Sequence, residues 1–325
     1  LAGGVLVPLN IRLSSFEFQF ILNDCQAEVV LFHQGLAHVL EDIADQLDPV
    51  RHFILLDTKR PPDWAFPHPL EKLLEKEPRE HLLDLMAQDE DAVAEIFYTS
   101  GTSGQPKGVM LTHRNLYLHA LEAALVTRTS EADVVLHVIP LFHVNGWGTP
   151  QYLTCVGGTH VMLHRFDIEE VFELIHEHKV TAFSLVPTMA TALVNHHGVD
   201  RFDLTSVRLV IIGGAPSNPR LVRDVVEVFG CECCAGYGLT ETAPVLTIAT
   251  LKTHLDLTEE QKFERMATAG HPVPGVQLRL IDEEGNPLPW DGVQIGEIVV
   301  RSDTVMAGYL NRPEATRAAF KGGWF

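Results

Sequence analysis

The sequence has 325 residues, 46% of them hydrophobic, which is enough to bury a large core in two or three domains or subdomains. Its 43 acidic residues outnumber the 24 basic ones and give a formal net charge of −19. This charge argues against a nucleic-acid binder, because phosphate-backbone affinity depends on clustered Lys and Arg. No apolar run approaches the roughly 20 residues that a transmembrane helix needs, so we expect no integral membrane segment.

Strand-like and helix-like segments alternate from residue 1 to about residue 250, and this alternation predicts a parallel α/β sheet. Ser14 and Glu17 form a capping box that opens the first helix. Residues 29–32 and 53–56 are apolar runs with the length of buried strands.

Residues 98–108 follow the apolar run 92–97 and form the most informative segment of the chain. Its glycines allow positive φ and a close approach of the backbone to an anion. The donors for phosphate oxygens come from Thr99, Ser100, Thr102, Ser103 and Lys107, interleaved with Gly101, Gly104 and Gly108. The spacing is neither the Walker pattern nor a dinucleotide fingerprint, and a flexible linker is the alternative. Because linkers rarely follow a buried strand, we expect a phosphate-binding loop.

The next signal is His143, which comes after a helix from about Arg114 and a strand that we expect to end at Pro140. Residues 140–148 place this His beside glycines and Trp147. An imidazole at a strand end could reach a carboxylate or an oxyanion. A structural His in an aromatic corner is the alternative.

Two more strand-to-helix units follow. In the first, we expect Asp167 and Glu170 to cap a helix, and residues 181–186 to form a strand closed by Pro187. In the second, residues 207–212 form a strand, and Asn218-Pro219 opens the helix that follows. Small residues follow the strand at 207–212 and would let a flat ring lie against the backbone. These residues are Gly213, Gly214, Ala215 and Pro216.

Three of the five cysteines lie in the run Cys231-Glu232-Cys233-Cys234. No second Cys pair or His stands at zinc spacing, and Cys231 and Cys233 are placed to share one face of a buried strand. We therefore expect core cysteines. No signal peptide is visible, so a reducing cytosol is the expected location, and contact with a membrane surface stays open.

Residues 235–242 combine an aromatic ring with oxygen ligands. Tyr237 stands between Gly236 and Gly238 and offers an exposed ring for stacking on a base. Thr240 and Glu241 suit a phosphate and a hard cation such as Mg²⁺. A core-packed ring and a solvated carboxylate are the alternatives. We expect residues 235–242 to follow a strand, as residues 140–148 and 213–216 do, and open α/β sheets bind ligands at such positions.

Past about residue 268 the chain changes to Gly, Pro and short alternating runs. Residues 276–281, a turn at 282–286 and residues 296–300 predict a β-rich, barrel-like module.

The loop at 98–108, the segment around His143 and the run 236–241 occur in this order and at fitting separations. Together they resemble the adenylate-forming superfamily of acyl-CoA synthetases, peptide-synthetase adenylation domains and firefly-type luciferases, over essentially the whole chain. Residues 143–147, with the stretch from 253–255 to 270–272, are most similar to medium- and long-chain fatty acyl-CoA synthetases.

This resemblance implies an α/β fold, the large domain of the acyl-CoA synthetase and luciferase type. Two parallel-sheet α/β subdomains are expected at residues 1–130, with the phosphate loop, and 131–255, with the acyl and adenine site. An incomplete β-barrel subdomain is expected at residues 256–325, without the C-terminal lid domain.

The activity that the resemblance implies is an AMP-forming acid–thiol ligase. It activates a fatty carboxylate with Mg·ATP and then transfers the acyl group to CoA, and His143, Lys107, Thr240 and Glu241 are the expected catalytic residues. By the family pattern, the phosphates are held by Thr99, Ser100, Gly101, Thr102, Ser103, Gly104 and Lys107, and Thr240 also touches phosphate. Adenine is bordered by Gly214, Ala215, Pro216, Gly236, Tyr237 and Gly238, and Mg²⁺ is bound by Thr99 and Glu241. The acyl site is lined by His143, Val186 and Pro187, and Trp147 gates a fatty-acid tunnel.

The chain opens without Met and stops at Phe325 without a polar tail, so both ends resemble cuts through a longer protein. The family's ribose-binding Asp, its hinge and its mobile domain with a catalytic Lys are expected beyond Phe325. We therefore expect this chain to bind its ligands with impaired turnover, because losing a transition-state cation costs on the order of 10²–10³ in rate. A homodimer of the full-length protein stays open.

Other functions compete with this one. An adenylating enzyme for aryl or other carboxylic acids is close in kind, and its amino-acid version would need an acidic residue in the acyl pocket. None stands among Trp147, Val186, Pro187, Thr188 and Met189. A non-catalytic module that binds ATP or acyl-AMP is a second alternative. A Rossmann enzyme is excluded, because no G-x-G-x-x-G follows a strand.

Overall fold

A computed structural model of the chain describes residues 3–57, 60–66, 69–75, 89–99 and 105–325. The α-helices in these ranges are α1 (Ser15–Asp24), α2 (Ala37–Glu41), α3 (Leu70–Leu74), α4 (His113–Thr127), α5 (Val144–Val156), α6 (Ile168–His178), α7 (Pro187–Val194), α8 (Pro219–Phe229), α9 (Glu259–Met266) and α10 (Pro313–Ala319). The strands are β1 (Val29–Phe32), β2 (His52–Leu55), β3 (Val93–Thr99), β4 (Lys107–Thr112), β5 (Val134–His137), β6 (Thr159–Met162), β7 (Ala182–Leu185), β8 (Leu209–Ile212), β9 (Glu232–Gly238), β10 (Val245–Ile248), β11 (His271–Pro272), β12 (Gln277–Ile281), β13 (Pro287–Leu288), β14 (Glu297–Arg301) and β15 (Gly308–Tyr309).

The helix starts are set by the predicted caps. The Ser14 hydroxyl accepts from the Glu17 backbone N–H, and the Glu17 carboxylate accepts from the Ser14 N–H at 2.8 Å, so the capping box of α1 is confirmed. Asp167 caps α6 with its carboxylate, whereas Glu170 takes part through its backbone N–H. Asn218 caps α8 by accepting from a backbone N–H. Each side-chain oxygen satisfies a backbone donor that the first helical turn leaves free.

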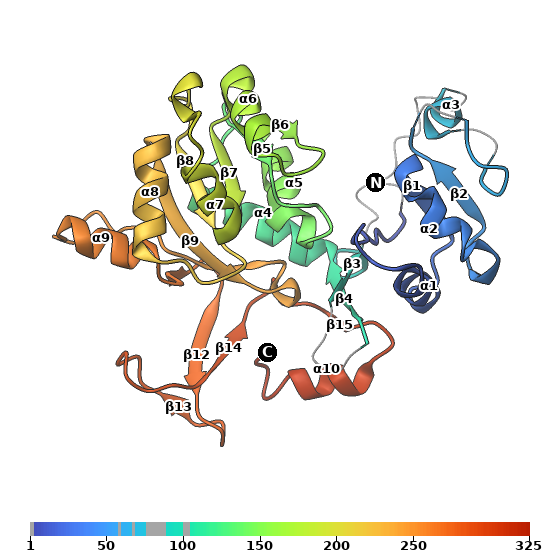
Figure 1. The fold of residues 1–325 in the computed structure, drawn as a ribbon. Helices are drawn as coiled ribbons and strands as arrows, with labels where there is room; N and C mark the ends of the chain where they lie inside the picture. The colour runs from blue at the N-terminus through green and yellow to red at the C-terminus, as the bar shows by residue number, and fades with distance from the viewer. Residues whose placement is uncertain (1–2, 58–59, 67–68, 76–88, 100–104) are drawn as a thin grey trace.

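The central layer is a seven-stranded sheet in the order β11-β10-β9-β8-β7-β5-β6 (Figure 1). Strands β5 to β9 pair in parallel, and β10 and β11 add an antiparallel edge. The predicted parallel α/β sheet is therefore confirmed. In parallel sheets, ligands bind outside the carboxyl ends of the strands.

Helices bury both faces of this sheet, because successive strand residues point to opposite sides. Val210 and Cys233 belong to the core under α6, α7 and α8, whereas Leu209 and Cys234 belong to the core under α4 and α5. Cys231 packs on the same side as Cys233, as predicted, and burial raises the pKa of all three thiols. The described residues contain no cluster of three or more His, Cys, Asp or Glu that could hold a metal ion.

The phosphate-loop segment differs from the prediction in one respect. It joins two antiparallel strands, β3 and β4, whereas the sequence predicted a strand before the loop and only a helix after it. Residues 107–112 bury alternate apolar side chains against β3 and then cap α4 through Thr112, so they form a strand. The edge of β4 pairs with β15, which comes from the far end of the chain.

Two smaller sheets complete the fold. Parallel strands β1 and β2 lie with α1, α2 and α3 in a unit at one side of the molecule, beyond the β3–β4 hairpin (Figure 1). Strands β12, β13 and β14 form the predicted β-rich module as an antiparallel sheet that projects from the other side, and the described residues contain no closed barrel. None of the described helices is both long enough and apolar enough to cross a membrane.

Candidate active site

A cavity of about 710 Å³ lies beyond the carboxyl ends of the parallel strands and extends between the sheet and α4. Of the predicted site residues, those that line it are Thr99, His143, Trp147, Val186, Gly214, Gly236, Tyr237, Gly238 and Thr240. The structure thus gathers residues from five separate stretches of sequence around one space.

Other predicted site residues lie beside this cavity or outside the described ranges. Lys107, Pro187, Ala215, Pro216 and Glu241 are not among the lining residues. The predicted loop residues Ser100, Gly101, Thr102, Ser103 and Gly104 lie outside the described residues.

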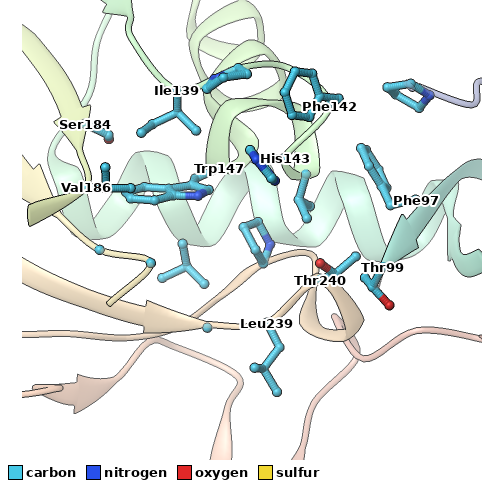
Figure 2. Close-up of a pocket in the computed structure, with 18 of the residues that line it drawn as sticks. Phe97, Thr99, Ile139, Phe142, His143, Trp147, Ser184, Val186, Leu239 and Thr240 are labelled. Carbon is cyan, nitrogen blue, oxygen red and sulfur yellow. The ribbon is translucent and has the colours of Figure 1, made fainter. Parts of the chain in front are cut away.

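The cavity has a polar end and an apolar end. In Figure 2, Thr99 and Thr240 lie together at one end, Trp147 lies beside Val186 at the other, and His143 lies between them. Other parts of the wall are apolar and come from α4 (Ala123 and Val126), α7 (Met189) and the sheet (Ile248). A polar group and a long apolar group of one ligand could therefore occupy the same cavity.

Lys107 and Glu241 form a cluster with Tyr309 next to the polar end. The Tyr309 hydroxyl donates to Glu241 Oε1 at 2.9 Å, and Lys107 Nζ lies 5.3 Å from the centroid of the Tyr309 ring. Burial, together with the neighbouring Glu241 carboxylate, raises the pKa of Tyr309, so the phenol stays a donor. Tyr309 was not predicted from the sequence, because it lies about 68 residues away from Glu241 in the chain.

The oxygen donors at this end suit a cation that arrives with a phosphate ligand. Thr99 and Thr240 line the cavity, and Glu241, which follows Thr240 in the chain, has a second carboxylate oxygen that does not accept from Tyr309. Mg²⁺ is usually held by one or two carboxylates together with substrate phosphates. This donor set fits that mode of binding.

Tyr237 lies within β9, not after it, because this strand continues to Gly238. Its backbone pairs with Thr247 of β10, and its ring is half-buried against the core on the α4 side. The ring is therefore less exposed than predicted and partly follows the core-packed alternative, although Tyr237 does line the cavity.

A flat ring does lie against the small residues after β8, and it is the indole of Trp147. A Cβ on Gly213 would come within 3.1 Å of Trp147 Cζ3, and one on Gly214 within 3.0 Å of Cζ2. Gly214 also has a φ of +77°, a backbone conformation that residues with a Cβ rarely adopt. Glycine at these two positions is what allows the indole to approach.

His143 follows β5, which ends at His137 and so stops three residues before the predicted end. Its ring lies 4.6 Å from that of Phe142. Burial lowers the pKa of His143, and the Arg12 guanidinium adds to this effect. At neutral pH the imidazole is therefore uncharged and can donate one hydrogen bond and accept another.

The first turn of α5 is left-handed and rests on a buried carboxylate. Asn145 has a φ of 44° and a ψ of 52°, and its side-chain amide donates to Glu95 of β3. Both residues are buried. Burial raises the pKa of Glu95 to about 7, and the hydrogen bond from Asn145 opposes that rise. This pair was not predicted, although a Glu inside the apolar run 92–97 is a visible signal in the sequence.

Two charged residues from the N-terminal unit also line the cavity and were not predicted. They are Arg12, whose charge acts on His143, and Glu17. The Glu17 carboxylate is engaged by the backbone and hydroxyl of Ser14. It is the one carboxylate among the described lining residues.

The chain is similar to known proteins over nearly all of its length. The profile of the family described as AMP-binding enzyme matches residues 1–310. The chain is 40% identical to a long-chain-fatty-acid–CoA ligase of Thermus thermophilus, over 98% of its own length and 58% of the ligase. It is 32% identical to 4-hydroxybutyrate–CoA ligase 2 of Metallosphaera sedula, over 100% of its length and 60% of that protein.

A solved structure has the same fold. The inhibitor-bound N-terminal domain of FACL13 from Mycobacterium tuberculosis matches with a TM-score of 0.86 and 29% identity, over 99% of this chain and 76% of that one. The chain thus spans less than two thirds of the length of the curated relatives named above.

Proposed function

Because the chain belongs to the AMP-binding enzyme family, we propose that it forms the nucleotide and acyl pockets of an AMP-forming fatty acyl-CoA ligase. One observation carries this proposal: a single cavity is lined both by the hydroxyl-bearing Thr99 and Thr240 and by apolar residues that include Trp147, Ala123 and Val126. Its ligands would be ATP with Mg²⁺, a medium- or long-chain fatty acid, and CoA.

In the first step, a carboxylate oxygen of the fatty acid attacks the α-phosphorus of ATP. The bond from that phosphorus to the bridging oxygen breaks, and pyrophosphate leaves with the electron pair. Thr99, Lys107, Thr240 and the loop residues 100–104 would bind the phosphates, and alignment with charge neutralisation does most of the work. The neutral imidazole of His143, near the middle of the cavity, would donate to the acyl carboxylate.

In the second step, the CoA sulfur attacks the acyl carbonyl carbon. The bond from that carbon to the adenylate oxygen breaks, AMP leaves, and the thiol proton is released. The adenine would lie against Tyr237 between Gly236 and Gly238, and against the exit formed by residues 214–216. Trp147 would separate the polar end from the acyl tunnel, because its indole lies across the exit from β8.

Bound Mg²⁺ would supply positive charge to the phosphate oxygens. Thr99 and Glu241 would hold it, and Tyr309 would fix the orientation of the Glu241 carboxylate.

The proposal extends to the organisation of the chain. Subdomains at 1–130 and 131–255 would carry the phosphate loop and the acyl and adenine site, and 256–325 would belong to the β-rich subdomain. The edge strand β11 lies beyond the second of these boundaries. We place the full-length protein in the cytoplasm. Light scattering would test whether it forms a homodimer, and vesicle sedimentation would test whether it contacts a membrane surface.

The test is ATP–pyrophosphate exchange by the full-length gene product with a panel of fatty, aryl and amino acids. We expect the highest kcat/KM for medium- or long-chain fatty acids. Exchange with aryl acids alone would instead support the aryl-acid alternative. Calorimetric binding of ATP and a non-hydrolysable acyl-adenylate, without exchange for any acid, would favour the non-catalytic module.

An amino-acid substrate is disfavoured by one observation. Its ammonium group needs a free carboxylate in the pocket, and the one found among the described lining residues, Glu17, already caps α1.

A further inference from the structure

Five consecutive residues after β5 adopt left-handed backbone. Their φ angles are 38° at Val144, 44° at Asn145, 56° at Gly146, 63° at Trp147 and 78° at Gly148. Each non-glycine residue in this conformation costs roughly 1–2 kcal/mol, and a β-branched residue such as Val144 is especially disfavoured. We call residues 144–148 the left-handed turn. It persists only because its surroundings hold it.

The side-chain hydrogen bond that ties this turn to a neighbouring strand comes from Asn145. Its amide donates to the Glu95 carboxylate, and both side chains lie in the interior between β3 and α5. Glu95 forms no ion pair with any described cation. A carboxyl group without a cation partner is costly to bury, so core stability alone does not explain a glutamate here.

The strand that carries Glu95 is itself held firmly. Its neighbours Ala94 and Ile96 exchange backbone hydrogen bonds with Leu6 on one side, and β3 pairs with β4 on the other. Glu95 is therefore a fixed anchor for the turn. Neither Glu95 nor Asn145 lines the cavity, so any effect on a ligand must pass through the turn.

The turn decides where two cavity residues lie. His143 precedes it, and Trp147 is its fourth residue, with the indole seated on Gly213 and Gly214 (Figure 2). The last residue of the turn is also fixed, because a Cβ on Gly148 would come within 2.2 Å of the buried His119 ring. A small change in the turn would therefore move the indole.

Building on the proposed function, we propose that Glu95 is a positioning residue: through Asn145 it holds the left-handed turn and thereby sets Trp147 between the polar end of the cavity and its acyl tunnel. It touches neither substrate. Its loss should disturb binding of the fatty acid more than binding of ATP.

The test compares Glu95→Ala, Glu95→Met and Glu95→Gln in the full-length protein. Met replaces the carboxyl with an apolar group of similar length, so this variant avoids an unpaired buried charge and should fold. Gln keeps an oxygen that can accept from Asn145. We expect Ala and Met to raise the KM for fatty acid at least 10-fold, with the KM for ATP within twofold and kcat within threefold. Gln should restore the fatty-acid KM to within threefold of wild type.

Glu122→Ala is the matched control. Glu122 on α4 is another carboxyl whose pKa burial raises to about 7, and it is not part of the turn. This control should leave both KM values unchanged. If Glu95→Met altered kcat and both KM values alike, or if Gln failed to restore the fatty-acid KM, Glu95 would be a structural residue only and the inference would be overturned.

A second readout does not depend on turnover. The fluorescence of Trp147 is obtained by subtracting the spectrum of the same variant carrying Trp147→Phe. Glu95→Met should shift this emission to the red, since the indole leaves its seat, whereas Glu95→Gln and Glu122→Ala should not. An unshifted spectrum in Glu95→Met would overturn the inference, whether or not the protein is active. Inactivity of the wild-type protein with every fatty acid would instead refute the proposed function.

Discussion

At the scale of single residues, burial controls which ionisable groups of this protein carry charge. His119 on α4 is almost fully buried against Gly148, and its Nε2 has no hydrogen-bond partner among the described residues. Burial lowers its pKa to about 4, from 6.5. The ring is therefore neutral in the folded protein over the range where an unfolded chain would bind a proton.

This difference predicts how stability depends on pH. Between pH 6.5 and about 4 the unfolded state binds the extra proton, so the His119 contribution is complete above pH 6.5 and is lost as the pH falls toward 4. In His119→Leu that loss should be absent. Urea unfolding from pH 4 to 7.5 measures it, and parallel curves for wild type and variant would contradict the prediction.

Tyr309 is the second residue whose role can be measured directly. In Tyr309→Phe the Glu241 carboxylate loses a hydrogen bond, which for a charged partner is worth about 1.5–3 kcal/mol. We expect the kcat of pyrophosphate exchange to fall about 10-fold or more, because each 1.36 kcal/mol is tenfold in rate. Tyr117→Phe, on the exposed face of α4, is the control and should keep the wild-type rate.

At the scale of elements, one buried ion pair joins the starts of three parallel strands. Asp133, directly before β5, accepts from Arg208 Nε at 2.7 Å and Nη2 at 2.9 Å, and also from Thr181 Oγ1 at 2.6 Å. Burial alone would raise the pKa of Asp133, but the hydrogen bonds from Arg208 and Thr181 outweigh it and lower the pKa. The cluster fixes the register of β5, β7 and β8 at their amino ends.

Asp133→Ala should therefore destabilise the whole sheet. Removing one partner of a buried pair costs about 3–5 kcal/mol, and we expect the lower end because a third of the Arg208 side chain is exposed. Chemical denaturation gives the value. Asp224→Ala, which breaks the surface pair with Arg220 on α8, should cost no more than about 1 kcal/mol. Equal losses in the two variants would argue against this role of Asp133.

The elements also explain which parts could be predicted from the sequence. Helix starts at Ser14, Asp167 and Asn218 follow from local hydrogen bonding, and strands β5, β7 and β8 of the central sheet follow from short apolar runs. The left-handed turn could not be predicted, because Val144 and Trp147 disfavour that conformation and the side-chain hydrogen bond that supports it comes from Glu95, about 50 residues earlier. Strand β4 was missed for a similar reason: its partners are β3 and the distant β15.

The site was predictable to the extent that its residues follow strand ends. His143, Val186, Gly214 and Thr240 do so, and the parallel sheet brings them together. The contributions of Arg12 and Tyr309 depend on how the flanking units pack against that sheet, which no local pattern records.

At the scale of the whole molecule, Asp24 connects three parts that are far apart in sequence. Its carboxylate accepts from the Tyr98 hydroxyl at 2.7 Å and pairs with Arg312 Nη2 at 3.2 Å. The N-terminal unit, the β3–β4 hairpin and the segment before α10 therefore meet at one partly buried carboxylate.

Asp24→Ala should loosen the N-terminal unit from the rest. We expect amide hydrogens of residues 29–55 to exchange at least 10-fold faster, while those of β7 and β8 keep their rates, because the central sheet has its own core. Hydrogen exchange read by mass spectrometry distinguishes the two regions. Asp48→Ala, at an exposed site of the same unit, is the control, and faster exchange spread evenly over the chain would contradict the prediction.

The pairing of Val109 with Tyr309 has a consequence for how the protein is made. The two residues are about 200 positions apart, so the β3–β4 hairpin leaves the ribosome long before its third strand exists. The parallel sheet from β5 to β9 can form in the meantime, because all of its strands precede residue 239. The parallel strands can thus pair first, and the sheet of β3, β4 and β15 is completed only when translation has passed Tyr309.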